Sequence, residues 1–150
     1  MVCHLGEFAS LLYSQKPEHL NGDRYKSAGA NAVDASGQLD TVECINIAKD
    51  DALAWPKIAR REYPKNVNDR MEPTIAPFIR KSLKVNNTIL DVFNGRLGLP
   101  PGELLKRHTL EESSGSEARV IKNPANQDVN RAAIGSHTDF GTLVSTTNGR

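Results

Sequence analysis

The sequence predicts an α+β fold in which a helical region (residues 1–117) precedes strands (residues 118–150). Two observations lead to this prediction. Between Glu72 and Leu97 the apolar residues recur every three or four positions, which is typical of a helix with one buried face. After residue 117 the pattern becomes strand-like, over "ARVIKNP", "AAIGSHTDF" and "TLVSTT". Because two or three strands cannot make a sandwich or barrel, we expect the β part to be incomplete.

The elements expected before the long helix are short. Residues 8–12 predict a short helix or a helix end. Glycines punctuate residues 21–39 and predict turns around Tyr25. Alternation in "DTVECINIA" predicts a strand over residues 41–48, and the following "KDD" leaves the sheet. Residues 52–65 contain prolines and several basic residues, which indicate an exposed loop with a short turn of helix.

The long helix is expected to begin near Glu72, because Pro73 and Pro77 are tolerated only near a helix start. Gly98 supplies a left-handed stop, and a second short helix is expected from Glu103 to His108. The polar stretch "EESSGSE" predicts a loop. The residues expected on the buried face are Ile75, Phe78, Ile79, Ile89, Val92, Phe93 and Leu97.

Composition narrows the classes of function. A net charge of +1 gives no electrostatic reason to expect a nucleic-acid or membrane partner, and no apolar run approaches a membrane span. The start of the chain does not resemble a signal peptide. Cys3 and Cys44 are expected to be buried or free thiols rather than a disulfide, which suits a cytoplasmic protein. The basic stretch "PKIARREYPK" is expected to be a solvated face, with a phosphate contact as the alternative.

The most specific chemical feature is His137-Thr138-Asp139. On a strand, residues two apart point to the same face, so His137 and Asp139 would aim an imidazole and a carboxylate at one point. Such a pair suits Fe(II), Mn or Zn, and a facial triad adds a second histidine. The alternative is structural: His137 caps or hydrogen-bonds the next loop, and Asp139 makes a turn.

The segments around this motif resemble a known family. "GSHTDFGTLV", preceded by "EARVIKNPA", is similar to the core of the Fe(II)- and 2-oxoglutarate-dependent dioxygenases of the isopenicillin N synthase-like group. "DTVECINIAKDD", "YKSAGANAVDASG" and "LGLPPGELLKRHTLEESSGSEARVIKNP" resemble its fungal branch. The resemblance runs from about Leu11 to Leu143.

The resemblance implies a double-stranded β-helix, or jelly roll, flanked by helices. It implies that His137 and Asp139 are the first two iron ligands. It also implies oxidation of a small organic substrate by hydroxylation, desaturation or ring closure, while the co-substrate 2-oxoglutarate becomes succinate. Plant members often carry Asn-Tyr-Tyr-Pro before the motif and use its polar residues for the co-substrate. Here Lys122 and Asn123 stand in that stretch and are the candidates for the same contact.

The resemblance also has departures. The family's distal histidine and Arg-x-Ser pair have no match here, and neither does its opening segment, so we expect a chain truncated at both ends. The polar tail "VSTTNGR" suggests a truncated or misassembled reading frame. The alternatives to an enzyme are an inactive fragment that self-associates through unpaired strand edges, and a metal-binding or interaction remnant. In the remnant, His137 and Asp139 would act with a partner's ligand. We expect the chain alone to be inactive.

Overall fold

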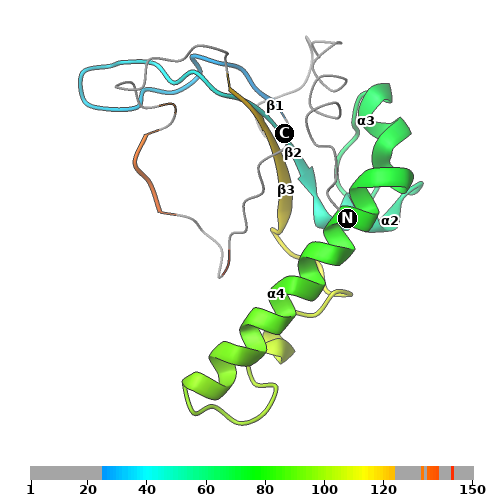
Figure 1. Ribbon diagram of the computed structural model, residues 1–150. Coiled ribbons are helices and arrows are strands. Elements are labelled where there is room, and N and C mark those ends of the chain that lie inside the picture. The colour runs from blue at the N-terminus through cyan, green and yellow to red at the C-terminus, as the bar shows by residue number, and fades with distance from the viewer. Residues whose placement is uncertain (1–24, 124–132, 134, 139–142, 144–150) are drawn as a thin grey trace. The chain divides into compact units, whose positions relative to one another are not determined.

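The computed structural model describes residues 25–123, 133, 135–138 and 143 (Figure 1). Strands and helices are both present, which confirms the α+β class. The described residues before Ala48 and from Glu117 onward form one compact unit, and Ala48–Ser116 form another. The elements in chain order are β1 (Tyr25–Lys26), β2 (Glu43–Ala48), α2 (Lys49–Ala54), α3 (Lys65–Arg70), the π-helical turn η1 (Met71–Ile75), α4 (Ala76–Arg96), the 3₁₀ turn η2 (Leu105–Arg107) and β3 (Glu117–Lys122).

The three strands form one sheet in the order β1-β2-β3 (Figure 1). β1 pairs antiparallel with β2, with Tyr25 opposite Ile45. On the other side of β2, Arg119 Nε donates to Asn46 Oδ1 at 2.7 Å. Lys122 Nζ, at the end of β3, lies 3.9 Å from Glu43 Oε2, at the start of β2. Residue numbers thus rise along β3 as they fall along β2, so β3 is antiparallel to β2 as well. The strand predicted over residues 41–48 is therefore confirmed within two residues.

The predicted order of elements was wrong. The helices do not precede the sheet, because β1 and β2 come before them and β2 is the central strand. β3 contains only exposed and half-exposed residues, whereas Ile45 and Ile47 on β2 are each 1% exposed. The sheet therefore forms around β2, and β3 joins it from about 70 residues later in the chain.

The loop between β1 and β2 is held by Asp40, which is 3% exposed. Its carboxylate accepts the Gly29 N–H at 2.9 Å and lies 2.6 Å from Lys26 Nζ. Burial by itself would raise the pKa of Asp40, but the hydrogen bonds from Lys26 and Gly29 outweigh it and lower that pKa. Gly29 and Gly37 both have φ of 79°, as the predicted turns require.

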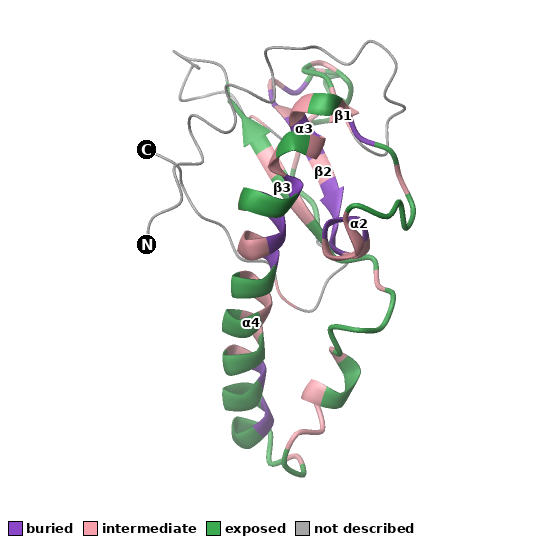
Figure 2. Ribbon diagram, turned by 90° about the vertical axis from the view of Figure 1, so that its right-hand side faces the viewer, coloured by how far each residue is buried: buried purple, intermediate pink, exposed green. Residues whose placement is uncertain are grey.

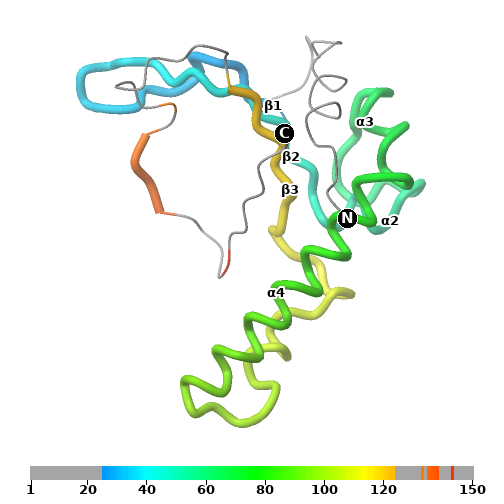
Figure 3. The backbone as a smooth tube through the Cα atoms, in the orientation of Figure 1, coloured from blue at the N-terminus to red at the C-terminus, as the bar shows by residue number. Residues whose placement is uncertain are grey.

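The long helical run begins earlier than the sequence predicts. It starts with α3 at Lys65, passes through η1 and continues as α4 to Arg96. Pro73 lies inside the π-helical turn, where it has no N–H to donate to the helical ladder. The predicted stop is confirmed: Gly98 has φ of 65°, and the chain then doubles back so that η2 contacts α4 (Figure 3).

The buried side of α4 differs from the predicted face in its last third. Ile79 and Leu90 are buried, and so is Asn94, whereas Val92 and Phe93 are 57% and 45% exposed. Figure 2 shows the buried residues along one side of the helix. The prediction considered apolar residues only. The buried side of α4 also includes Asn94, whose side chain is hydrogen-bonded to the backbone of residues 99, 100 and 104.

Within the described residues, no helix combines the length and the apolar character needed to cross a membrane. The short helix expected at residues 8–12 and most of the strand expected in "TLVSTT" lie outside the described part of the chain. Cys44 is a free, buried cysteine, as expected. Burial raises the pKa of its thiol, so it stays protonated at neutral pH and is poorly suited to act as a nucleophile.

Candidate functional site

His137 lies on the surface and outside any strand, so the strand predicted for this part of "AAIGSHTDF" is corrected. The backbone of Gly135 lies close to the backbone of Val33: a Cβ atom added to Gly135 would lie 2.8 Å from the Val33 carbonyl oxygen. The Ala133 carbonyl accepts the Thr41 N–H at 3.2 Å. Ala133 and Gly135 therefore contact residues 41 and 33, and residues 135–138 do not form a strand. The alternation of apolar residues in the sequence cannot reveal these contacts.

The imidazole of His137 makes one contact that bears on metal chemistry. Its Nδ1 lies 2.8 Å from the Gly135 carbonyl oxygen. Because a carbonyl only accepts, Nδ1 must carry the proton in this contact, and the neutral ring then has its lone pair on Nε2. This is the arrangement found in many histidine metal ligands, where a backbone carbonyl fixes the tautomer.

Of the other three candidate residues, the structure describes two. Lys122 ends β3 and lies near the Glu43 carboxylate, and Asn123 follows it as an exposed residue. Asp139 lies outside the described residues. In the part of the chain that the structure describes, no three His, Cys, Asp or Glu side chains gather as a metal ion would need. The described residues therefore contain one of the two proposed ligands and no complete facial site.

Sequence reasoning missed a buried polar cluster between α2 and α3, in the stretch expected to be an exposed loop. Tyr63 is 7% exposed and Asp51 is 3% exposed. The Tyr63 hydroxyl donates to Asp51 Oδ2 at 3.0 Å and accepts the Ala48 N–H at 3.0 Å. Asp51 Oδ1 also accepts the backbone N–H groups of Arg60 at 2.6 Å and Arg61 at 3.2 Å. The buried carboxylate is thus fully hydrogen-bonded.

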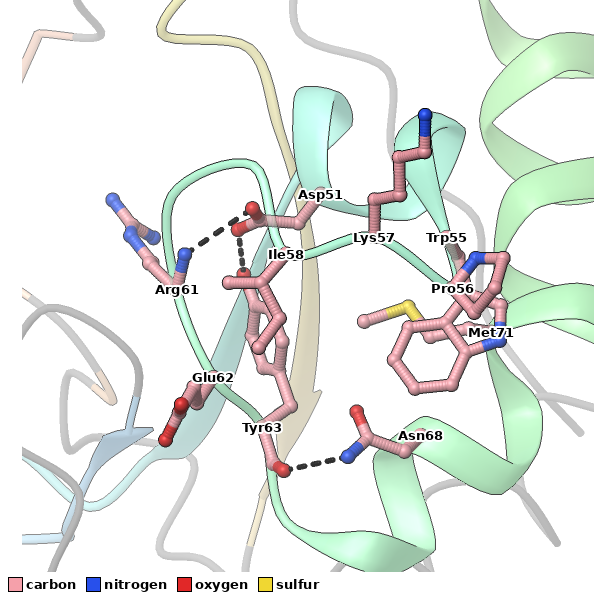
Figure 4. Close-up of a pocket in the computed structure, with 10 residues that line it drawn as sticks. All are labelled: Asp51, Trp55, Pro56, Lys57, Ile58, Arg61, Glu62, Tyr63, Asn68 and Met71. Atoms are coloured by element: carbon pink, nitrogen blue, oxygen red, sulfur yellow. Dashed lines mark hydrogen bonds between the residues drawn. The ribbon is translucent and has the colours of Figure 1, made fainter.

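This cluster forms one wall of a cavity of about 230 Å³ (Figure 4). Its apolar lining comes mainly from Trp55, Pro56, Ile58 and Met71. No local signal in the sequence marks this cavity, because its residues come from an irregular connection and the start of the helical run.

A second polar network joins α2 to the segment that returns from η2. Lys49 is 3% exposed, and its ammonium donates to the carbonyls of Leu110 at 3.1 Å and Glu112 at 2.6 Å. Asp50 pairs with Arg60 at 3.0 Å. Within the basic stretch, Arg60 therefore has an intramolecular carboxylate partner, and the network serves to fix the returning segment.

No family model, curated protein or solved structure matches the chain in comparisons with known proteins. Two places in the described residues have the chemistry to bind a ligand. They are the surface imidazole of His137, whose Nδ1 contacts the Gly135 carbonyl, and the cavity beside Tyr63 with its aromatic and apolar lining.

Proposed function

We propose that the protein belongs to the Fe(II)- and 2-oxoglutarate-dependent dioxygenases and that His137 and Asp139 are two of its iron ligands. The β1-β2-β3 sheet would then be part of a jelly roll, and the activity would be oxidation of a small organic substrate. The single observation that best supports the proposal is the Nδ1 contact of His137 with the Gly135 carbonyl, which leaves the lone pair of the neutral ring on Nε2.

Two further features support the family. The segments that carry the resemblance, "ECINIA" and "EARVIK", are neighbouring strands of one sheet although they are far apart in sequence. His137 and Asp139 are also two positions apart, which keeps both side chains within reach of one ion in a loop as well as on a strand. Because Gly135–Thr138 are not in a strand, strand alternation does not place the two side chains on one face.

The described residues do not complete an iron site. Iron and 2-oxoglutarate, when bound, would supply the oxidising chemistry of the family. The part expected of this chain is to hold the metal through His137 and Asp139 and to offer Lys122 or Asn123 to the co-substrate carboxylate. Lys122 lies 3.9 Å from Glu43, so the co-substrate would compete with that carboxylate for the ammonium.

Turnover of the co-substrate tests the enzyme proposal. The full chain is incubated in air with Fe(II), ascorbate and 2-oxoglutarate, and succinate is measured. Although we expect a chain without a third ligand to be inactive alone, the enzyme proposal requires succinate formation that depends on iron and is lost in His137→Ala. The matched control is His108→Ala, at a half-exposed histidine at the end of η2. Succinate formation that is equal in both variants would refute the assignment of His137.

A second candidate is a non-catalytic module that holds a metal together with a partner's ligand. The exposure of His137 on a loop favours it, because a surface imidazole is accessible to a second molecule. β1 and β3 are the outer strands of the described sheet, which is where self-association through strand pairing would begin. This candidate predicts metal-dependent association, measured by analytical ultracentrifugation with and without Fe(II), and no succinate. Metal-independent sedimentation would argue against it.

A further inference from the structure

The cavity beside Tyr63 lies within one compact unit and has no assigned role. Figure 4 shows the Trp55 ring and the Met71 side chain on one side, with Tyr63 and Ile58 opposite. Met71 is fully buried and Trp55 is half-buried, whereas Ile58 is 61% exposed. The cavity is therefore apolar toward its interior and bounded by movable side chains toward solvent.

Most polar groups in the wall already have partners. Asp51 accepts three hydrogen bonds, and the Tyr63 hydroxyl donates one and accepts one. The charged lining residues carry both signs, since Lys57 and Arg61 are balanced by Asp51 and Glu62. The wall thus offers no net charge to select an ionic ligand.

Among the buried side-chain polar atoms of the described wall, Asn68 Oδ1 is the exception. Asn68 Nδ2 donates to the Tyr63 carbonyl oxygen at 2.9 Å, which fixes the orientation of the amide because a carbonyl cannot donate. Its Oδ1 is buried and has no hydrogen-bond partner in the described part of the protein. Figure 4 shows this oxygen directed toward the space between Tyr63 and Trp55. A buried acceptor without a donor is destabilising, so a donor that enters the cavity removes that penalty.

We propose that this cavity binds a small, neutral aromatic molecule with one hydrogen-bond donor, of the phenol class. An apolar cavity of about 150 Å³ accepts benzene, so this cavity has room for a single substituted ring. The ring packs between Trp55 and Ile58, and its hydroxyl donates to Asn68 Oδ1. The donor reaches that covered oxygen once the half-buried Trp55 and the exposed Ile58 rotate, which moves no fully buried side chain.

Trp55 is the only tryptophan, so its fluorescence reports directly on the cavity. The full chain is titrated with p-cresol and with 4-methylanisole, which keeps the ring and lacks the donor, with excitation beyond their absorption. We expect saturable binding of p-cresol with a dissociation constant on the order of 1 mM, as suits a ligand of this size. The anisole should bind about tenfold more weakly, since it leaves Asn68 Oδ1 unsatisfied.

Two variants locate the binding. Asn68→Leu should weaken p-cresol about tenfold and leave 4-methylanisole unchanged, whereas Asn87→Leu, at an exposed position on α4, should alter neither. The comparison of the two ligands on the unmutated chain does not depend on the Asn68 variant folding. Equal affinities for p-cresol and 4-methylanisole, or a fluorescence change that never saturates, would overturn the proposal.

Discussion

Tyr63→Phe tests whether the buried cluster holds its unit together. The substitution removes one hydroxyl that joins the Ala48 N–H to Asp51 Oδ2, with both distances 3.0 Å. Each buried group left without its partner costs roughly 1–3 kcal/mol. Asp51 keeps its two bonds to backbone N–H groups, which limits the loss on that side. We therefore expect the free energy of unfolding to fall by about 3 kcal/mol.

Urea denaturation followed by circular dichroism measures this change. For a chain of this length, about 3 kcal/mol corresponds to a drop in melting temperature of roughly 6–12 °C. The matched control is Tyr25→Phe, because Tyr25 is half-exposed on β1 and its hydroxyl bonds to Glu43, so this variant should lose less than about 1 kcal/mol. A Tyr63 variant no less stable than this control would refute the reasoning.

The same variant has a pH signature. Burial raises the pKa of Tyr63 to about 12 from 10.0. When folding raises the pKa of a group, that group adds its full contribution to the free energy of unfolding at pH values below its unfolded pKa. This contribution is lost as the pH rises from the unfolded pKa to the folded pKa. The unmutated chain should therefore lose this contribution between about pH 10 and 12. Tyr63→Phe cannot lose it, so the difference in stability between the two proteins should narrow over that range.

Three other perturbations follow from the fold. Gly95→Ala should stabilise the protein by about 0.5–1 kcal/mol, whereas Gly98→Ala should destabilise it by roughly 1 kcal/mol. A Cβ atom would meet no neighbour within 4 Å at either position, but only Gly98 has a positive φ. The midpoints of urea unfolding measure the difference in stability between the two variants. Asn94→Ala should cost roughly 2–4 kcal/mol in the same assay, because its amide holds the backbone groups that follow α4, and a loss under about 1 kcal/mol would contradict this. Asp40→Asn should make the free energy of unfolding depend less on pH in acid. The folded-state pKa of Asp40 is lowered, so its carboxylate adds stability above the unfolded pKa of 3.8, and this stability disappears as the pH falls through the folded pKa. An unchanged acid-unfolding curve would contradict this.

The parts of the fold that sequence predicts well are those with a long local pattern. The strand at β2 and the helix α4 carry regular apolar spacing, and Gly98 marks the helix end. The first turns of the helical run were missed because "KNVNDR" has a single apolar residue, Val67, although that residue is completely buried. A polar segment with one buried anchor looks like a loop when only periodicity is considered.

The sites depend on contacts that no local pattern contains. Tyr63 finds its partners 12 and 15 positions earlier, so its burial could not be inferred from the charged residues around it. Gly135 packs against Val33, about 100 residues earlier in the sequence, and His137 lies outside the expected strand. The spacing of His137 and Asp139 was visible in the sequence, whereas the tautomer fixed by the Gly135 carbonyl required the structure.

The most direct test of the proposed iron site is an anaerobic titration of the full chain with Fe(II) and 2-oxoglutarate, followed by visible absorption. A weak charge-transfer band appears only when both are chelated at one metal. We predict such a band at one iron per chain, lost in His137→Ala and retained in His108→Ala. Absence of the band in the unmutated chain, or a band that survives His137→Ala, would contradict the assignment of His137 as an iron ligand.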